Sequence, residues 1–188
     1  MPVIASLSNG SILIEHLHDA TTTEGANGEV AGTIAFLPAE LAEVERIKSL
    51  YPTSKAAIMP VLWMAQKKWG WISRDVMTYV GTLLDLSFAH VYGVASFYTM
   101  YFKRPMGRHH VQVCTNVSCL LRGGERIFDS VSSTFGIGHN QRTPDGVISL
   151  EEVECMGACG GAPMIAINET YHENMTLERL ESVLRSLE

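Results

Sequence analysis

The chain has 188 residues, of which 46% are hydrophobic and 18% charged, and its formal net charge at pH 7 is -6. This length allows one large hydrophobic core or two small ones, and the mildly acidic balance argues against nucleic acid as a partner. Residues 1–37 contain no lysine or arginine. Signal peptides and mitochondrial presequences need early positive charge, and no apolar run approaches the roughly 20 residues that span a bilayer. We therefore expect a cytoplasmic chain without direct membrane insertion.

The first 37 residues are predicted to form a flexible or extended arm. They are rich in Ser, Thr, Gly, Ala and Asn. Apart from short apolar runs they show neither helical nor alternating periodicity, a composition typical of segments without a packed core. We assign residues 1–37 to this arm.

The next part of the chain has a helical pattern of apolar residues. One amphipathic segment begins at Pro38 and is ended by Pro52, and a second runs from Ile58 to Gly70. Ser73 and Ser87 are expected to cap two further helices at their amino ends. The sequence thus predicts four short helices with brief connections, which indicates a four-helix bundle over residues 38–102.

From residue 108 onward the pattern alternates between strands and helices. We predict a thioredoxin-like domain over residues 108–188, so the fold class of the chain is α+β. The predicted elements are a strand at 109–114, a helix at 118–134 ending at Gly136, a strand at 147–154, an apolar run at 164–167, a short strand at 171–172 and a final helix carrying Leu177 to Leu187. The segment Thr143-Pro-Asp-Gly146 is a turn signal.

All four cysteines fall into two pairs, Cys114 with Cys119 and Cys155 with Cys159. Each pair follows a predicted strand of the same sheet, so the pairs are expected to converge at one edge. A 2Fe-2S cluster needs four thiolates, two on each tetrahedral iron. A structural zinc ion also takes four thiolates and stays an alternative, although zinc spacers usually have two residues. Structural disulfides belong to oxidising compartments and are disfavoured.

Several other residues carry local expectations. Gly123 and Gly124 are expected inside a helix where the backbone packs closely, and Gly157, Gly160 and Gly161 are expected to permit unusual angles or close approach. Pro163 is a candidate for a cis peptide bond. The histidines are expected at strand edges, including the adjacent pair His109 and His110. One or two interface anchors are expected among six aromatic residues, namely Trp69, Trp71, Phe97, Tyr98, Tyr101 and Phe102.

Three segments together resemble one known family. They are Gly93-Val-Ala-Ser-Phe-Tyr98, Cys114-Thr-Asn-Val-Ser-Cys119 and Glu154-Cys-Met-Gly-Ala-Cys159-Gly-Gly-Ala-Pro163. The chain is similar in these segments to the thioredoxin-like 2Fe-2S subunit of the NADH-oxidising module of respiratory complex I. The resemblance covers roughly residues 38–188 and does not extend to the first 37 residues.

The resemblance implies that Cys114, Cys119, Cys155 and Cys159 ligate one 2Fe-2S cluster, the first two on one iron and the last two on the other. It implies a partner subunit that binds FMN and NADH, together with other peripheral-arm iron-sulfur subunits, at the inner face of the membrane. No G-x-G-x-x-G follows a predicted strand, so we expect no nucleotide site and no catalytic residue in this chain. Similar modules serve NAD-linked hydrogenases and formate dehydrogenases, and the sequence does not separate these assemblies.

Overall fold

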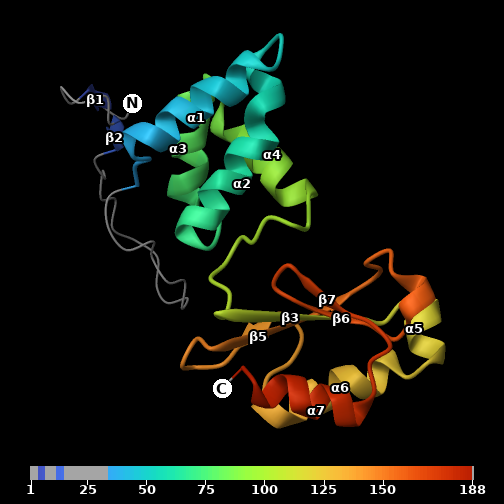
Figure 1. The fold of residues 1–188 in the computed structure, drawn as a ribbon. Coiled ribbons are helices and arrows are strands. Elements are labelled where there is room, and N and C mark those ends of the chain that lie inside the picture. The colour runs from blue at the N-terminus through green and yellow to red at the C-terminus, as the bar shows by residue number, and fades with distance from the viewer. Residues whose placement is uncertain (1–3, 7–11, 15–33, 188) are drawn as a thin grey trace. The chain divides into compact units, whose positions relative to one another are not determined.

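The chain divides into two compact units, Met1–Pro105 and Met106–Glu188, in a computed structural model (Figure 1). The structure describes residues 4–6, 12–14 and 34–187. Most of the predicted arm therefore lies outside the described residues. Three of its segments are described. Two of them, β1 (Ile4–Ser6) and β2 (Ile12–Ile14), pair antiparallel. The third, residues 34–37, packs on the helices that follow, and Phe36 is buried in their core.

The first unit contains four α-helices that contribute to one apolar core. All four helices predicted in this part of the chain are present, with a short 3-10 turn between the first two. The elements are α1 (Pro38–Ser49), η1 (Ser54–Ala57), α2 (Ile58–Trp69), α3 (Arg74–Leu84) and α4 (Phe88–Phe97). The chain bends by 119° between α3 and α4, so these two helices cross rather than lie side by side. The core is formed by residues such as Val44, Leu62, Val80 and Val91.

The predicted ends of these helices are confirmed by their hydrogen bonds. Ser73 Oγ accepts from the backbone N-H of Val76 at 3.2 Å, and Ser87 Oγ accepts from that of His90 at 3.3 Å. Both contacts satisfy amide groups that have no partner inside the helix. Gly70 ends α2 with a φ of 79°, a left-handed angle that glycine adopts without strain.

A buried glutamine fixes the chain where it leaves α4. Gln66 Nε2 donates to the carbonyl of Met100 at 2.8 Å, and Gln66 Oε1 accepts from the backbone N-H of Phe102 at 2.7 Å. Gln66 thus supplies hydrogen-bond partners for one carbonyl and one amide of this non-helical stretch, and its own polar atoms are satisfied in return, which is why a polar side chain is tolerated in this core.

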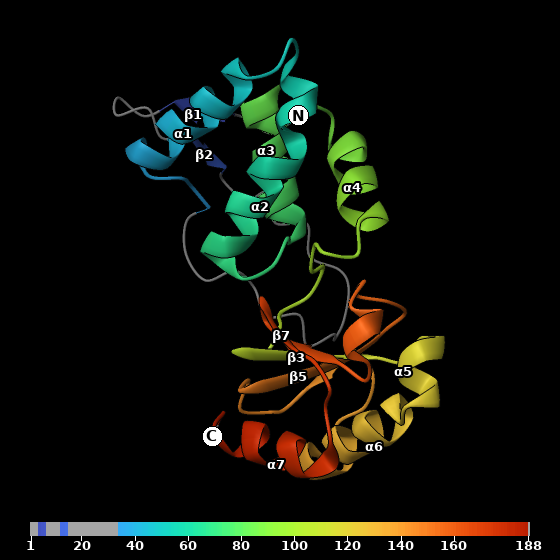
Figure 2. The ribbon, with the colours of Figure 1, turned by 45° about the vertical axis from the view of Figure 1, so that its right-hand side comes forward.

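The second unit is a five-stranded sheet with the strand order β4-β5-β3-β6-β7. Strands β3 and β5 are parallel and the other pairs are antiparallel. The helices α6 and α7 cover one face of the sheet (Figure 2), where Ile127 and Leu180 pack on Val111 and Leu150. The elements are β3 (His109–Cys114), α5 (Val117–Leu121), α6 (Gly124–Phe135), β4 (Gln141–Arg142), β5 (Ile148–Val153), η2 (Cys159–Gly161), β6 (Ile165–Ile167), β7 (Thr170–His172) and α7 (Leu177–Arg185).

The prediction of one continuous helix over residues 118–134 is wrong. The helix is broken into α5 and α6, and Gly123 adopts a φ of 95° at the break. Gly124 begins α6 so close to the first cysteine loop that an added Cβ would stand 2.7 Å from the Cys114 carbonyl oxygen. The expectation of close backbone packing is therefore confirmed for Gly124, whereas Gly123 lies between the two helices, as the residue that precedes the first turn of α6.

Two further local predictions are confirmed. The backbone N-H of Gly146 donates to the carbonyl of Thr143 at 2.9 Å, which closes the expected turn. The peptide bond between Ala162 and Pro163 is cis.

Among the described residues, no single helix is long and apolar enough to cross a membrane. The bent pair of α3 and α4 passes on combined length and composition alone, a weak criterion that buried core helices also meet.

Candidate metal centre

Parallel pairing of β3 and β5 brings the two cysteine pairs to the same end of the sheet. Cys114 is the last residue of β3 and pairs with Val153, the last residue of β5. Past this point the backbone N-H of Thr115 still donates to the carbonyl of Val153 at 3.2 Å. Cys155 follows two residues later, so both cysteine loops begin at one edge, as the sequence predicted.

The first pair is buried. Cys114 and Cys119 are each 2% exposed, and they form a small apolar cluster with Ala162 and Met164. The backbone N-H of Cys114 donates to the carbonyl of Met164 at 3.3 Å, which ties the first loop to the strand that follows the second loop. Cys114 is thus held by the sheet, whereas Cys119 lies in α5, the short helix that follows.

The second pair is exposed, and its two sulfur atoms lie together. Cys155 Sγ and Cys159 Sγ are 3.9 Å apart. Two thiolates bound to one tetrahedral metal at about 2.3 Å lie roughly 3.8 Å from each other. Gly157 shapes the loop with a φ of 75°, and its N-H donates to Cys155 Sγ at 3.4 Å. The side chains therefore already stand at the separation that one metal ion requires.

Of the two other glycines in this loop, one meets the expectation from the sequence and one does not. An added Cβ on Gly161 would stand 2.0 Å from the Glu173 carboxylate, so the close approach expected there is confirmed. Gly160 has open space where its Cβ would be and no left-handed φ. The structure therefore gives no reason for a glycine at position 160.

Contacts across the two loops show that the pairs converge. Cys114 Sγ lies 3.7 Å from the carbonyl oxygen of Glu154, the residue directly before Cys155. Burial raises the pKa of the Cys119 thiol to about 11, with further upward contributions from a hydrogen bond and charge at Cys114 and from charge at Cys159. The backbone amide of Met164 acts in the opposite direction. Charge on the other member of its own pair and charge on the second pair thus act on Cys119 in the same direction.

The donor set fits an iron-sulfur group better than any other chemistry in the chain. Four thiols are the ligands that such clusters take, and all four sit in the two converging loops. As the side chains stand, no group of three or more His, Cys, Asp or Glu residues among the described residues could hold a metal ion. The thiols are arranged instead as two pairs, and a metal must displace the proton that burial favours on Cys119.

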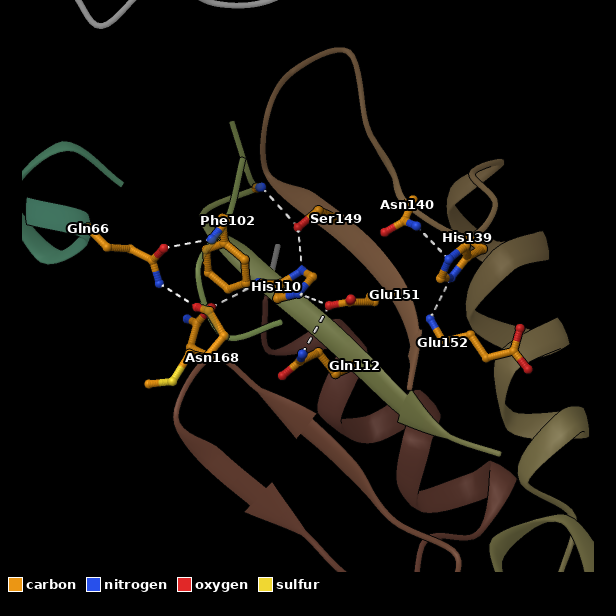
Figure 3. Close-up of polar contacts among 12 residues, drawn as sticks. Gln66, Phe102, His110, Gln112, His139, Asn140, Ser149, Glu151, Glu152 and Asn168 are labelled. Atoms are coloured by element: carbon orange, nitrogen blue, oxygen red, sulfur yellow. Dashed lines mark hydrogen bonds and ion pairs between the residues drawn. The ribbon is translucent and has the colours of Figure 1, made fainter. Parts of the chain in front are cut away.

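A row of polar side chains lies on the sheet face opposite α6 and α7 (Figure 3). His110 Nδ1 lies 2.8 Å from Ser149 Oγ, and His110 Nε2 lies 2.9 Å from Glu151 Oε2. Gln112 Nε2 donates to the same carboxylate oxygen at 3.0 Å. These residues alternate along β3 and β5 with the apolar residues of the core, as strand geometry requires.

This arrangement corrects the prediction of a strand-edge position for His110, whereas His172 does lie in the edge strand β7. His110 belongs to β3, the central strand, and is only 4% exposed. Ser149, which accepts from the backbone N-H of Gly107 at 3.0 Å, and Glu151 supply the partners that its burial demands. The alternation of the sequence His-His-Val-Gln-Val contained this signal, because it places His110 and Gln112 on one face.

The six aromatic residues named from the sequence range from buried to exposed, and three of them, Trp69, Trp71 and Phe102, are half-buried. Tyr101 is buried and donates from its hydroxyl to the carbonyl of Met59 at 2.9 Å. Phe97 is 78% exposed and Tyr98 38% exposed, and their rings make an edge contact with centroids 5.0 Å apart. An exposed aromatic pair of this kind is typical of interaction sites.

A second exposed apolar group lies beside the cysteines. Val117, Leu120 and Leu121 all belong to the short helix α5 that carries Cys119, and all three are exposed. This group was not predicted from the sequence, because residues 118–134 were expected to form one helix and no exposed apolar side was assigned to it.

A sheet of this topology with four converging thiols defines a thioredoxin-like iron-sulfur protein. Comparison with known proteins agrees: the chain belongs to the thioredoxin-like [2Fe-2S] ferredoxin family, whose model matches residues 44–188.

Curated relatives share much of the chain. It is 40% identical over 144 residues to a subunit of the NADH-quinone oxidoreductase of Rhizobium meliloti, covering 77% of this chain and 86% of the relative. It is 42% identical over 147 residues to NADH-quinone oxidoreductase subunit 2 of Thermus thermophilus, covering 77% and 81% of the two chains.

Among solved structures, an NAD+-reducing [NiFe]-hydrogenase in its H2-reduced state has the same fold. The TM-score is 0.60 at 20% identity, and the alignment covers 68% of this chain and 22% of the hydrogenase chain. At this identity the likeness is one of fold.

Proposed function

We propose that this chain is an electron-transfer subunit of an NADH:quinone oxidoreductase and that Cys114, Cys119, Cys155 and Cys159 hold one 2Fe-2S cluster. The observation that carries the proposal is the convergence of two thiol pairs at the ends of two parallel strands, with the outer sulfurs 3.9 Å apart. The relatives named NADH-quinone oxidoreductase subunits, at 36–42% identity, support this assembly rather than a hydrogenase or formate dehydrogenase module.

In this proposal Cys114 and Cys119 bind one iron, and Cys155 and Cys159 bind the other. Such a cluster, when bound, accepts and returns single electrons. The protein keeps the inner pair away from water and presents the outer pair at the surface. The N-H of Gly157 points its positive end at the Cys155 sulfur, which favours negative charge at that ligand. No acid, base or nucleophile of this chain is needed.

The partner in this proposal is a subunit that binds FMN and NADH and exchanges single electrons with the cluster. Exposure of Cys155 and Cys159 supports this role, because electrons cross most readily where the ligands reach the surface. We further propose that the helical unit, with residues 38–102, is a four-helix bundle and that 108–188 is a separate 2Fe-2S domain. The complex would place both at the cytoplasmic face of the membrane, beside other iron-sulfur subunits.

The ligand assignment is tested by metal analysis and electron paramagnetic resonance of the purified full chain. We expect two irons and two sulfides per chain and a rhombic signal after reduction. Cys155→Ser and Cys159→Ser should each lose most of that signal while helical circular dichroism persists. Ser118→Ala, next to a proposed ligand, is the matched control and should keep the signal. A colourless protein that contains zinc, or unchanged signals in both cysteine variants, would contradict the proposal.

The assembly is tested separately by affinity purification of the tagged chain from cells that express it naturally. We expect an FMN-containing subunit to copurify and NADH to reduce the complex, with quinone as the electron acceptor. Copurification of a hydrogenase or a formate dehydrogenase subunit would instead establish the alternative assembly.

A further inference from the structure

The two thiol pairs differ in access. Cys155 and Cys159 are exposed, whereas Cys114 and Cys119 are almost completely buried. A dissolved oxidant can therefore reach the outer sulfurs and not the inner ones, because thiol reactivity toward external reagents follows accessibility.

The outer sulfurs are also close to bonding distance. A disulfide has an S–S length of about 2.05 Å, so the 3.9 Å separation of Cys155 Sγ and Cys159 Sγ must shrink by about 1.9 Å. Apart from its two chain neighbours, no atom lies within 4 Å of where a Cβ on Gly157 would stand, so the loop is not packed at this point. The two sulfurs meet when the side chains rotate or the loop shifts by this distance.

The loop is held in place by protein contacts and not only by a metal. Tyr171 Oη donates to the carbonyl of Met156 at 3.1 Å, within the loop. Just past it, the backbone N-H of Asn174 donates to the carbonyl of Gly161 at 2.6 Å. These contacts come from β7 and the residues after it, so the two sulfurs stay near each other in protein that carries no cluster.

We propose that Cys155 and Cys159 form a disulfide in chains without a cluster, and that this bond must be reduced before the site can be loaded. The first statement rests only on the geometry of the two thiols. The second rests on the proposed function, because it assumes that all four thiolates are needed to hold the cluster.

The oxidant in this proposal is a small-molecule disulfide such as oxidised glutathione. The sulfur of Cys155, which accepts a hydrogen bond from the N-H of Gly157, attacks one sulfur of the oxidised glutathione. A mixed disulfide forms as one glutathione thiolate leaves. Cys159 then attacks the Cys155 sulfur, which forms the intramolecular bond and releases the second glutathione. Two protein thiols lose two electrons in total, and their two protons end on the two glutathione molecules.

The test uses the full chain, stripped of metal by a chelator under reducing conditions and then treated with oxidised glutathione. Free thiols are blocked with one alkylating reagent in denaturant, disulfides are reduced, and the released thiols are labelled with a second reagent. Peptide mass spectrometry should find the second label on Cys155 and Cys159 and the first label on Cys114 and Cys119. A bond between Cys119 and Cys159, or outer thiols that stay free or carry one glutathione each, would overturn the proposal.

Two variants sharpen this result. Cys159→Ser removes the resolving thiol and should leave one glutathione attached to Cys155, whereas Cys114→Ser should form the same outer disulfide as the unaltered chain. Failure of Cys159→Ser to retain glutathione would contradict the assigned order of attack.

Cluster loading is then measured by adding iron and sulfide to oxidised and to reduced chain. We expect at least tenfold less 2Fe-2S absorbance in the oxidised sample, and full recovery after treatment with dithiothreitol. Equal loading of both samples would overturn the proposal that the disulfide must be reduced before the cluster can be loaded. If the reduced chain also fails to load, the proposed function fails, while the mass spectrum still decides the disulfide.

Discussion

At the scale of single residues, the metal centre depends on how tightly its backbone is packed around the inner pair. Gly124 lies against the carbonyl groups of both Cys114 and Cys119, so the start of α6 is pressed against the first cysteine loop. Backbone atoms cannot move aside as the end of a flexible side chain can. This contact makes Gly124 a support of the site although it is no ligand.

Gly124→Ala is therefore expected to destabilise the chain by about 1–3 kcal/mol, the usual cost of overpacking a filled site, and to lower its iron content. Urea unfolding and iron analysis measure the two effects. Gly160→Ala is the matched control, because open space surrounds its Cβ position. If the two variants unfold at the same urea concentration, the close packing at Gly124 does not contribute to the free energy of unfolding.

A second residue-scale prediction concerns alkaline pH. Burial, followed by charge at Tyr98, raises the pKa of Tyr101 from 10.0 to about 12. Between these values the unfolded chain loses the phenol proton and the folded chain keeps it, so stability falls as pH rises from about 10 to 12. Thermal unfolding across this range should show the loss.

Tyr101→Phe serves as the control for this effect. The variant removes the titrating group and the hydroxyl contact with Met59, so it is expected to be less stable at pH 8 and to show a shallower alkaline slope. An unchanged slope in this variant would assign the alkaline loss to other groups.

The chemical roles of residues were easier to predict from the sequence than the surroundings in which the fold places them. The four cysteines stood out because thiols in two spaced pairs have few uses. The position of His110 was missed, since its burial depends on Ser149 and Glu151 of a strand 39 and 41 residues away. The local alternation placed His110 on one face of its strand, but partners this distant in the sequence were not visible in that pattern.

At the scale of elements, the helices were predicted better than the break between α5 and α6 or the short edge strand β4. Capping residues such as Ser73 and Ser87 act within one turn, so their effect is visible in a short stretch of sequence. Strand β4 has only two residues, Gln141 and Arg142, and exists because it pairs with β5. The break before α6 likewise depends on the contact of Gly124 with another loop.

The exposed carboxyl end of α4, where Phe97 lies, is predicted to contact the partner subunit. Phe97→Ala is expected to weaken binding of the FMN-containing partner by about tenfold or more, because exposed aromatic anchors commonly contribute above 1 kcal/mol. Titration of the partner, followed by surface plasmon resonance, measures the change. Leu50→Ala, at the end of α1 and also exposed, is the control and should bind normally. Normal binding by the Phe97 variant would place the interface elsewhere.

At the scale of the whole molecule, the metal centre belongs to one of the two units. The apolar cores around the sheet and around the inner cysteines contain only residues from 111 to 187. The helical unit has its own core, which ends with Tyr101. Each unit thus meets the first requirement for independent folding, a hydrophobic core of its own.

Residues 106–188 expressed alone are therefore expected to fold and to take up a cluster with the spectrum of the full chain. Circular dichroism, urea unfolding and electron paramagnetic resonance check this outcome. The same fragment with Cys155→Ser is the control and should fold without giving the signal. A fragment that unfolds without cooperativity would show that the sheet needs the helical unit.

The polar row of His110, Ser149 and Glu151 has a consequence for how the site is built. A slip of one residue between β3 and β5 would turn Ser149 and Glu151 into the apolar core and break the bonds that they form with the His110 side chain. Both faces of the sheet thus oppose the slip. The position of Cys155 relative to Cys114 is set by this pairing, so the register of β3 and β5 fixes the spacing of these two proposed ligands before any metal binds.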